Sequence, residues 1–274
     1  MVCGPTASGK SELSDVLADR LTETHGAFVP TLVVDSMQVY EELPVITNQA
    51  RRRPAELVGV VSITQEWTVA RHKACAEEII GRTETPFVLD AGTGMYLNAI
   101  LLEVPLAPKV ATRTRRIAAE ITAGAPNPRR ASRAKELELA GVPHRGSIWA
   151  GKLRYETALI YPRPNTGALD VAIANRSKRI VREGLEEAAK LKEMGARINT
   201  SVADSIGVRE LISHLSGEIT LEEAQTRITA RTRKLARRQM RWFDKLARTL
   251  NGRADLSITT RPMDTNTMHD RIWA

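Results

Sequence analysis

The chain has 274 residues, of which 42% are hydrophobic and only 4% aromatic, so aliphatic side chains must build its core. No apolar run is long enough to cross a bilayer and no signal peptide precedes the first motif, so we expect a cytoplasmic protein. Two cysteines and five scattered histidines predict neither a disulfide framework nor a metal site, whereas a net charge of +8 indicates a polyanionic partner.

A phosphate-binding loop opens the chain. Residues 4–11 read G-P-T-A-S-G-K-S, a full match to the G-x-x-x-x-G-K-[ST] pattern, between a short apolar strand and an amphipathic helix. Glycines let backbone N–H groups turn toward an anion, Lys10 adds a positive charge, and the Ser11 hydroxyl suits Mg²⁺. The sequence therefore predicts a di- or triphosphate site made of Gly4, Pro5, Thr6, Ala7, Ser8, Gly9, Lys10 and Ser11.

Short β-rich runs and helical patterns then alternate along the chain. Candidate strands lie at 31–34, 58–63 and 87–89, and a candidate helix lies at 69–80. This alternation predicts a P-loop NTPase-like α/β fold, in which helices flank a parallel sheet. Ligands bind beyond the carboxyl ends of such strands, so we expect the phosphate loop, Asp35 and the turn 92–94 to share one crevice.

Asp35 and the turn that contains Thr93 each have two chemical interpretations. Asp35 can orient Mg²⁺ or a sugar hydroxyl, as in a kinase, or it can take a proton from an attacking nucleophile. The turn Gly92–Gly94 can be a plain turn, or it can start a helix whose amides and Thr93 hydroxyl hold a leaving oxygen. Sequence spacing alone leaves both alternatives open.

The segment 105–150 differs from its flanks, because prolines interrupt it and basic residues crowd it. It has no buried-strand pattern, so we expect a short helical insertion. Beyond it we expect a returning strand at 157–161, a long helix at 169–194 and a helix that begins with a capping box of Thr220 and Glu223. We divide the chain into a first part of the α/β core at 1–104, the insertion at 105–150, the core completion with basic C-terminal helices at 151–250, and a tail at 251–274.

Residues 225–250 of the last predicted helix carry a charge excess equal to that of the whole protein. Between residues 225 and 250, nine basic residues are opposed only by Asp244. They recur at spacings of three and four beside an apolar seam, which predicts a basic face on an amphipathic helix. We define this basic face as Arg227, Arg231, Lys234, Arg238, Arg241, Lys245 and Arg248. Such a face is typical of nucleic-acid binding and is also common on ordinary solvated helices.

Five motifs, in this order, resemble one enzyme family. They read G-P-T-A-S-G-K-S, D-S-M-Q-V-Y, A-G-T-G-M-Y-L, S-I-G-V-R-E-L and T-R-K-L-A-R-R-Q-M-R-W-F, and they extend from Gly4 to about Leu246. The arrangement resembles the tRNA dimethylallyltransferases, also called isopentenyltransferases. The first three motifs are shared with adenylate isopentenyltransferases that make cytokinins, whereas the last resembles the tRNA-modifying branch.

The resemblance implies prenyl transfer in place of ATP hydrolysis. The loop would bind the diphosphate of dimethylallyl diphosphate with Mg²⁺, and the N6 amine of an adenosine adjacent to the anticodon would displace pyrophosphate. Asp35 would be the general base, Thr93 would contact the bridging oxygen, and Ser11 would serve the metal. Arg179, in a segment similar to the family's R-x-x-R helix, would be a second clamp on the diphosphate.

The resemblance also implies RNA contacts. An adenosine stacked in an anticodon stem-loop must be extruded before it can react, so a basic surface beside a deep pocket is required. The residues implied to contact adenosine or tRNA are Asp35, Ser36, Met37, Gln38, Arg113, Arg129, Arg130, Arg133, Arg238 and Arg241. The expected partners are tRNA and dimethylallyl diphosphate, without a membrane, and we expect a monomer.

Several features depart from the family pattern. Ala91 replaces a glycine, the insertion is much shorter than usual, and the N-terminal strand is almost missing, which suggests a clipped start. The short insertion favours a second hypothesis, prenylation of free AMP, ADP or ATP. A third hypothesis is a P-loop small-molecule kinase, or an RNA-binding protein whose catalysis has lapsed. A kinase would transfer phosphate from ATP and ignore prenyl donors.

Overall fold

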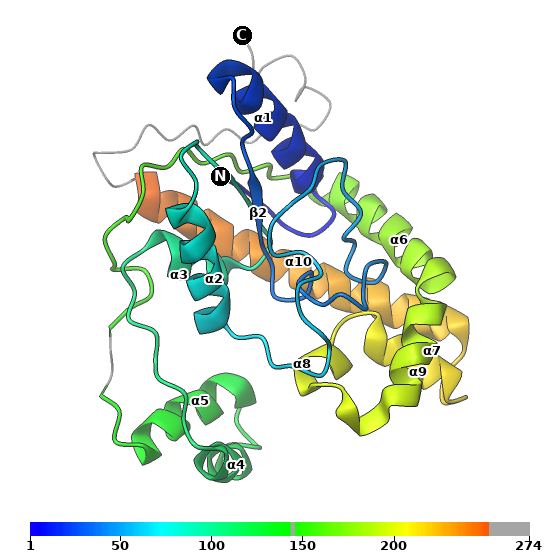
Figure 1. Cartoon of the computed structure of the whole chain (residues 1–274). Coiled ribbons are helices and arrows are strands. Elements are labelled where there is room, and N and C mark those ends of the chain that lie inside the picture. Colours follow the sequence, from blue (N-terminus) through cyan, green and yellow to red (C-terminus); the bar gives the residue numbers. More distant parts are fainter. Residues whose placement is uncertain (144–145, 252–274) are drawn as a thin grey trace. The chain divides into compact units, whose positions relative to one another are not determined.

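A small parallel sheet forms the centre of the computed structural model, which describes residues 1–143 and 146–251 (Figure 1). Its strands are β1 (Val2–Cys3), β2 (Thr31–Val34) and β3 (Val88–Ala91), in the order β1-β3-β2. Every residue of these strands is buried, as is typical of parallel strands covered on both faces. The chain is thus an α/β protein with a parallel sheet flanked by helices, as the alternating patterns predict.

The three strands end at one edge of the sheet, and backbone hydrogen bonds fasten together the segments that follow them. The Gly4 N–H donates to the Ala91 carbonyl at 3.2 Å. The N–H groups of Gly92 and Thr93 donate to the Val34 carbonyl at 3.2 and 3.0 Å. The phosphate loop, the segment that begins at Asp35 and the turn 92–94 therefore start side by side.

Two segments that the sequence predicted as strands form only single bridges with the rest of the described chain. In the segment 58–63, Val61 pairs with Tyr40, and left-handed backbone at Leu57 and Gly59 interrupts any longer ladder. In the segment 157–161, Ile160 pairs with Val2 of the two-residue strand β1. Neither segment is therefore a strand, and both strand predictions were wrong. Tyr40 and the two-residue strand β1 offer too few successive backbone hydrogen bonds to form a ladder.

Eight helices of the described chain lie in the same compact unit as the sheet. They are α1 (Lys10–His25), α2 (Val69–Gly81), α3 (Gly94–Leu101, whose last residue lies past the unit's boundary), α6 (Thr166–Glu183), α7 (Leu185–Met194), α8 (Thr200–Ala203), α9 (Val208–Leu215) and α10 (Leu221–Asn251), and a 3₁₀ turn covers Gly195–Arg197. No helix in the described ranges combines the length and apolar character that a membrane crossing needs. Residues 252–274, most of the predicted tail, lie outside the described residues.

The helix predicted at 169–194 is in fact two helices, because the chain breaks at Gly184 between α6 and α7. A Cβ on this glycine would lie 2.6 Å from the Ile180 carbonyl oxygen and 2.9 Å from Cγ1 of Ile46. Only a residue without a side chain permits that approach. The capping box of α10 is confirmed, since Thr220 and Glu223 exchange hydrogen bonds of 2.8 and 3.1 Å.

The S-I-G-V-R-E-L motif forms the start of α9 and packs it against Ile46. Gly207 has φ of 101°, and a Cβ there would lie 2.8 Å from Cγ2 of Ile46. Glu210 caps α9 by accepting from the Gly207 N–H at 2.9 Å. The motif thus seats α9 against the segment that follows β2, in the large hydrophobic cluster of that unit.

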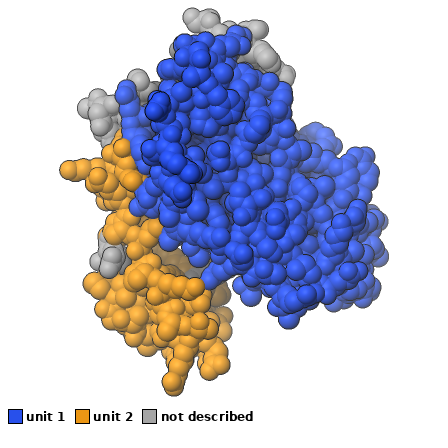
Figure 2. All heavy atoms as spheres, in the orientation of Figure 1, with its two compact units in different colours: residues 1–100, 155–274 blue, residues 101–154 orange. Residues whose placement is uncertain are grey.

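Residues 101–154 form a second compact unit (Figure 2). It contains α4 (Thr112–Ile121) and α5 (Pro128–Leu139), which pack on one another. Asn127 caps α5 by accepting from the Arg130 N–H at 3.3 Å. The two ends of the unit are joined where the Glu103 N–H donates to the Lys152 carbonyl at 2.9 Å.

Candidate active site

The phosphate loop has the backbone shape of an anion site. Ala7 and Gly9 are both left-handed, with φ of 63° and 77°, and α1 begins at the next residue, Lys10. Because Gly9 has no side chain to cap α1, the first N–H groups of the helix stay available to a ligand. The buried Ser8 hydroxyl has no hydrogen-bond partner among the described residues. In the described part of the chain, the loop therefore presents free backbone N–H groups and a free hydroxyl that could bind a polyanion.

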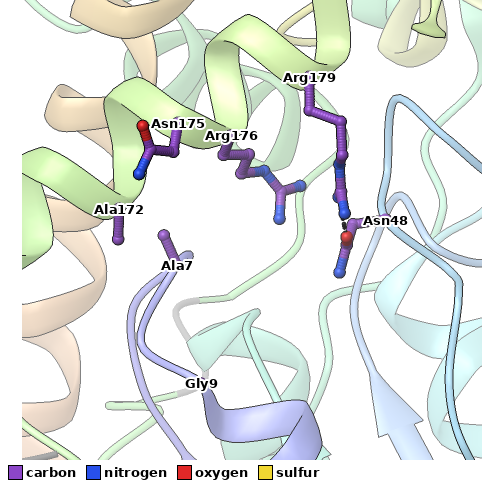
Figure 3. Close-up of a pocket in the computed structure, with 7 residues that line it drawn as sticks. All are labelled: Ala7, Gly9, Asn48, Ala172, Asn175, Arg176 and Arg179. Carbon is purple, nitrogen blue, oxygen red and sulfur yellow. Dashed lines mark hydrogen bonds between the residues drawn. The ribbon is translucent and has the colours of Figure 1, made fainter.

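A pocket of about 350 Å³ lies between the phosphate loop and α6 (Figure 3). In Figure 3, Arg176 extends from α6 into the space between Ala7 and Asn48, and Arg179 turns toward Asn48. A guanidinium nitrogen of Arg179 donates to the side-chain oxygen of Asn48. The residues that line the pocket are Ala7, Gly9, Asn48, Ala172, Asn175, Arg176 and Arg179.

Two arginines on one face of α6 make this pocket strongly cationic. Burial lowers the pKa of Arg176 to about 10, the charge of Arg179 acts in the same direction, and Asp35 opposes both. Arg176 thus keeps its charge at neutral pH in a place where that charge is costly. An anionic ligand between the loop and α6 would relieve this cost. Sequence reasoning chose Arg179 and missed Arg176, although their i, i+3 spacing signals a shared face.

Asp35 and Lys10 converge over Gly92. One carboxylate oxygen of Asp35, Oδ1, accepts from the N–H groups of Met37 at 2.8 Å and Gln38 at 3.3 Å. The other, Oδ2, lies 2.7 Å from the position that a Cβ on Gly92 would occupy. Cε of Lys10 lies 3.4 Å from the same position. Backbone bonds therefore orient one oxygen of Asp35 and leave the other facing the phosphate-loop lysine.

Thr93 lies directly beside this carboxylate. Its hydroxyl accepts from the Ser36 N–H at 3.1 Å and stands 3.5 Å from the Ser36 hydroxyl. Met37 packs on the hydrophobic core, and Gln38 is only 7% exposed. The structure thus brings Asp35, Ser36 and Thr93 together and turns Met37 and Gln38 inward.

Asp90, near the end of β3, forms an internal ion pair through Oδ2, while its buried Oδ1 has no hydrogen-bond partner among the described residues. Arg51 donates to Asp90 at 2.5 Å, to Asp15 of α1 at 2.7 Å and to the Ser11 carbonyl at 3.2 Å. Both carboxylates and the guanidinium are buried. Arg51 therefore fastens α1 to the sheet through Asp15 and Asp90.

A single glutamine of α10 joins the two loops of the site. The Thr6 N–H donates to Oε1 of Gln239 at 2.9 Å, and Nε2 of Gln239 donates to the Gly92 carbonyl at 2.9 Å. Trp242, one turn further, packs on Gly94, where a Cβ would lie 2.2 Å from the indole Cδ1. The C-terminal motif thus contributes to the site itself, which sequence reasoning had not foreseen for Gln239.

Comparison with known proteins identifies the family of this site. Residues 38–246 match the family model described as IPP transferase. A tRNA dimethylallyltransferase of Rubrobacter xylanophilus is 60% identical over 283 aligned residues, which cover 100% of this chain and 97% of the relative. The chain belongs to the tRNA dimethylallyltransferase family.

Other members agree with this assignment in sequence and in fold. The tRNA dimethylallyltransferase of Thermobifida fusca is 33% identical, with 100% of this chain and 92% of the relative covered. The crystal structure of the full-length tRNA isopentenylpyrophosphate transferase of Bacillus halodurans has the same fold, with a TM-score of 0.69 at 24% identity. That match covers 99% of this chain and 92% of the other.

In this member of the tRNA dimethylallyltransferase family, the basic face of α10 is exposed except at Arg231. Arg238 and Arg241 are both exposed, as are the other members of the face apart from Arg231. Arg231 instead pairs with Glu210 and donates to the Asp204 carbonyl at 2.6 Å. Asp244 is paired with Arg163 at 2.9 Å. The predicted basic face is thus confirmed for its six other residues. Arg231 was wrongly included, because it holds α10 against Glu210 and Asp204.

The predicted arginines of the insertion differ in their surroundings. Arg113 and Arg130 are exposed. Arg133 donates to the carbonyls of Ala107 and Pro108 at 3.2 and 2.9 Å and pairs with Glu136 at 2.7 Å, all within its own unit. The side chain of Arg129 lies outside the described residues. Arg133 therefore also has a structural task in the insertion.

A bound Mg²⁺ would depend on few protein ligands. Among the described residues, no three His, Cys, Asp or Glu side chains gather into a metal-binding group. Mg²⁺ commonly takes one or two protein oxygens and completes its shell with phosphates and water. The Ser11 hydroxyl, in the first turn of α1, fits that donor set.

Proposed function

We propose that this chain transfers a dimethylallyl group from dimethylallyl diphosphate to the N6 amine of an adenosine adjacent to the anticodon in tRNA, releasing pyrophosphate. The observation that carries this proposal is the convergence of Asp35 and Lys10 over Gly92, between an anion-binding loop and the segment that follows β2. Membership of a family whose curated relatives are named tRNA dimethylallyltransferases supports it. A phosphate loop that joins β1 to α1, with β3 beside β1, supports a P-loop NTPase-like architecture.

The donor diphosphate would lie in the pocket between the phosphate loop and α6. Backbone N–H groups at the start of α1, Lys10 and the guanidinium of Arg176 would hold its oxygens. Arg179 would complete the clamp on the side of Asn48. Mg²⁺, held at Ser11, would neutralise further charge on the leaving group. These cations make pyrophosphate a better leaving group, which is what an allylic donor needs.

The acceptor amine would enter from the side of Asp35. As the new C–N bond forms and the C–O bond to pyrophosphate breaks, Oδ2 of Asp35 would accept the proton that the amine loses. The N–H groups of Met37 and Gln38 hold Oδ1, so the carboxylate cannot turn away from the amine. Thr93 and Ser36 would orient the base or the bridging oxygen from the adjoining position.

The exposed basic face of α10 supports an RNA substrate over a free nucleotide. An anticodon stem-loop presents many phosphates, whereas AMP presents one, and binding of the former depends steeply on salt. Arg238 and Arg241 lie on α10 next to Gln239, which itself reaches the phosphate loop. The RNA-facing residues and the donor-facing residues are thus neighbours on one helix.

One assay separates the candidate functions. Radiolabelled dimethylallyl diphosphate and Mg²⁺ are incubated with the protein and with unmodified tRNA, AMP or no acceptor in parallel, and a further sample receives labelled ATP in place of the prenyl donor. Label in tRNA alone is the expected result. Label in AMP alone would indicate an adenylate isopentenyltransferase, and phosphate transfer from ATP without prenyl transfer would indicate a kinase; either result refutes the proposal.

A further inference from the structure

Gln239 is the one described side chain that hydrogen-bonds to both the phosphate loop and the turn 92–94. Its Oε1 accepts from the Thr6 N–H and its Nε2 donates to the Gly92 carbonyl, each at 2.9 Å. Thr6 is 8% exposed and Gly92 is buried, so water is a poor substitute for either bond. The two loops follow different strands, and this amide bridges them on the ligand side of the sheet.

The chemistry of the bridge requires an amide. Thr6 offers a donor and Gly92 offers an acceptor, so the bridging side chain must accept at one atom and donate at a neighbouring one. A carboxylate would satisfy Thr6 and repel the Gly92 carbonyl, and an ammonium would do the reverse. Gln239 satisfies both ends at normal hydrogen-bond lengths.

The helix that carries Gln239 is held firmly on the site. Ala236 and Phe243, which share its face of α10, are buried, and the Nε1 of Trp242 donates to the buried Asn98 at 3.2 Å. Arg238 and Arg241 lie exposed on the other face of α10. Gln239 is thus an inward-facing member of a motif whose Arg238 and Arg241 face solvent.

We infer that Gln239 is a positioning residue for the proposed transfer. By holding Thr6 and Gly92 at a fixed separation, it sets the distance between the donor diphosphate, which the phosphate loop binds, and Asp35, whose carboxylate lies over Gly92. A change of about 1 Å in such a distance can reduce turnover about 100-fold without loss of substrate binding. This role rests on the proposed function and adds to it a residue that touches neither substrate.

The test is Gln239→Met, which keeps the length of the side chain and removes both hydrogen bonds. We expect kcat for prenyl transfer to tRNA to fall at least about tenfold, while the Kd for tRNA changes less than about twofold. The matched control is Gln225→Met on the same helix, because the half-buried Gln225 side chain makes no hydrogen bond to the described residues. It should retain parental kcat.

Thermal unfolding distinguishes positioning from mere structural support. If Gln239→Met lowers Tm but leaves kcat per folded molecule unchanged, or if its whole defect lies in tRNA affinity, the inference is wrong. Should that variant fail to fold, Gln239→Glu keeps the bond to Thr6 and loses the bond to Gly92, and parental turnover in it would equally overturn the inference. Absence of prenyl transfer by the parent protein would refute the proposed function instead, so the two failures are distinguishable.

Discussion

The carboxylate of Asp35 occupies the space that any side chain on Gly92 would need. Its Oδ2 lies 2.7 Å from the position of a Cβ on residue 92, and Nζ of Lys10 lies 3.7 Å from the same position. Contacts to a Cβ below 3.0 Å essentially never occur, so one partner must move when a side chain is added. The absence of a side chain at Gly92 therefore leaves room for the carboxylate of Asp35 and the side chain of Lys10 above it.

We expect Gly92→Ala to reduce kcat about 100-fold by displacing Asp35 or the turn, since misplacement of about 1 Å has that effect. The measurement is steady-state prenyl transfer to tRNA. Gly81→Ala is the matched control, because a Cβ at Gly81 meets nothing within 4 Å. Equal activity of Gly92→Ala and Gly81→Ala would show that the close approach has no catalytic importance.

Asp35→Asn should preserve the fold and remove the base. An amide keeps an oxygen for the N–H groups of Met37 and Gln38 but cannot accept the proton of the amine, so we expect kcat to fall about 10²–10⁴-fold. Calorimetric titration with inorganic pyrophosphate and Mg²⁺ should give a Kd within about threefold of the parent. Unchanged turnover would remove Asp35 from the role of base.

Arg176→Met should stabilise the protein and impair donor binding. The pKa of Arg176 is lower in the folded chain than in the unfolded chain, so its charge costs stability at every pH below about 10. Removing the charge should raise Tm by about 2–4 °C for each kcal/mol recovered. The KM for dimethylallyl diphosphate should rise about 10–100-fold through loss of a charge-assisted hydrogen bond. A lower Tm with an unchanged KM would contradict both expectations.

The two exposed arginines of α10 should contribute to tRNA affinity through phosphate contacts. We expect Arg238→Gln with Arg241→Gln to weaken tRNA binding and to reduce the slope of log K against log salt by about 2. Filter binding between low and moderate salt measures that slope. If the double variant binds tRNA with the affinity and salt dependence of the parent protein, the basic face is ordinary solvated surface.

Arg231→Gln is the matched control for that experiment, because this arginine is engaged inside the protein. Its loss leaves Glu210, which is only 4% exposed, without its cation, so we expect a loss of stability of about 1–3 kcal/mol. The salt slope for tRNA should stay that of the parent. A reduced slope would mean that Arg231 leaves Glu210 to contact RNA.

Local features were predictable because they depend on neighbours in sequence. The phosphate loop, the start of α1 at Lys10, and the capping box of Thr220 and Glu223 all follow from residues within one turn of one another. The strand at 31–34 was predicted with its observed bounds, and the strand predicted at 87–89 lies at 88–91. Short β-branched runs in alternation with helices favour a buried parallel sheet.

Errors arose where distant segments decide the outcome. At Gly184, where α6 and α7 meet, Ile46, far away in sequence, occupies the space that a side chain would need. Arg231 has the helical spacing of the basic face, yet it forms an ion pair with Glu210 on another helix. Periodicity predicts on which face of a helix a residue lies. What that face contacts depends on how distant segments pack against it.

By itself, the sequence determined that a glycine turn leads into α1, that a carboxylate follows β2 and that α10 has a basic face, because glycine spacing, strand ends and helical periodicity are local properties. The sequence also predicted that the phosphate loop, Asp35 and the turn 92–94 share one crevice. Only the tertiary structure decided that Oδ2 of Asp35 lies beside Gly92, that Arg176 enters the pocket with Arg179, and that Gln239 joins both loops. The physical reason is that α6 and α10 lie far from the phosphate loop in the sequence. Only their packing beside it brings Arg176 into the pocket and Gln239 within hydrogen-bond reach of Thr6 and Gly92.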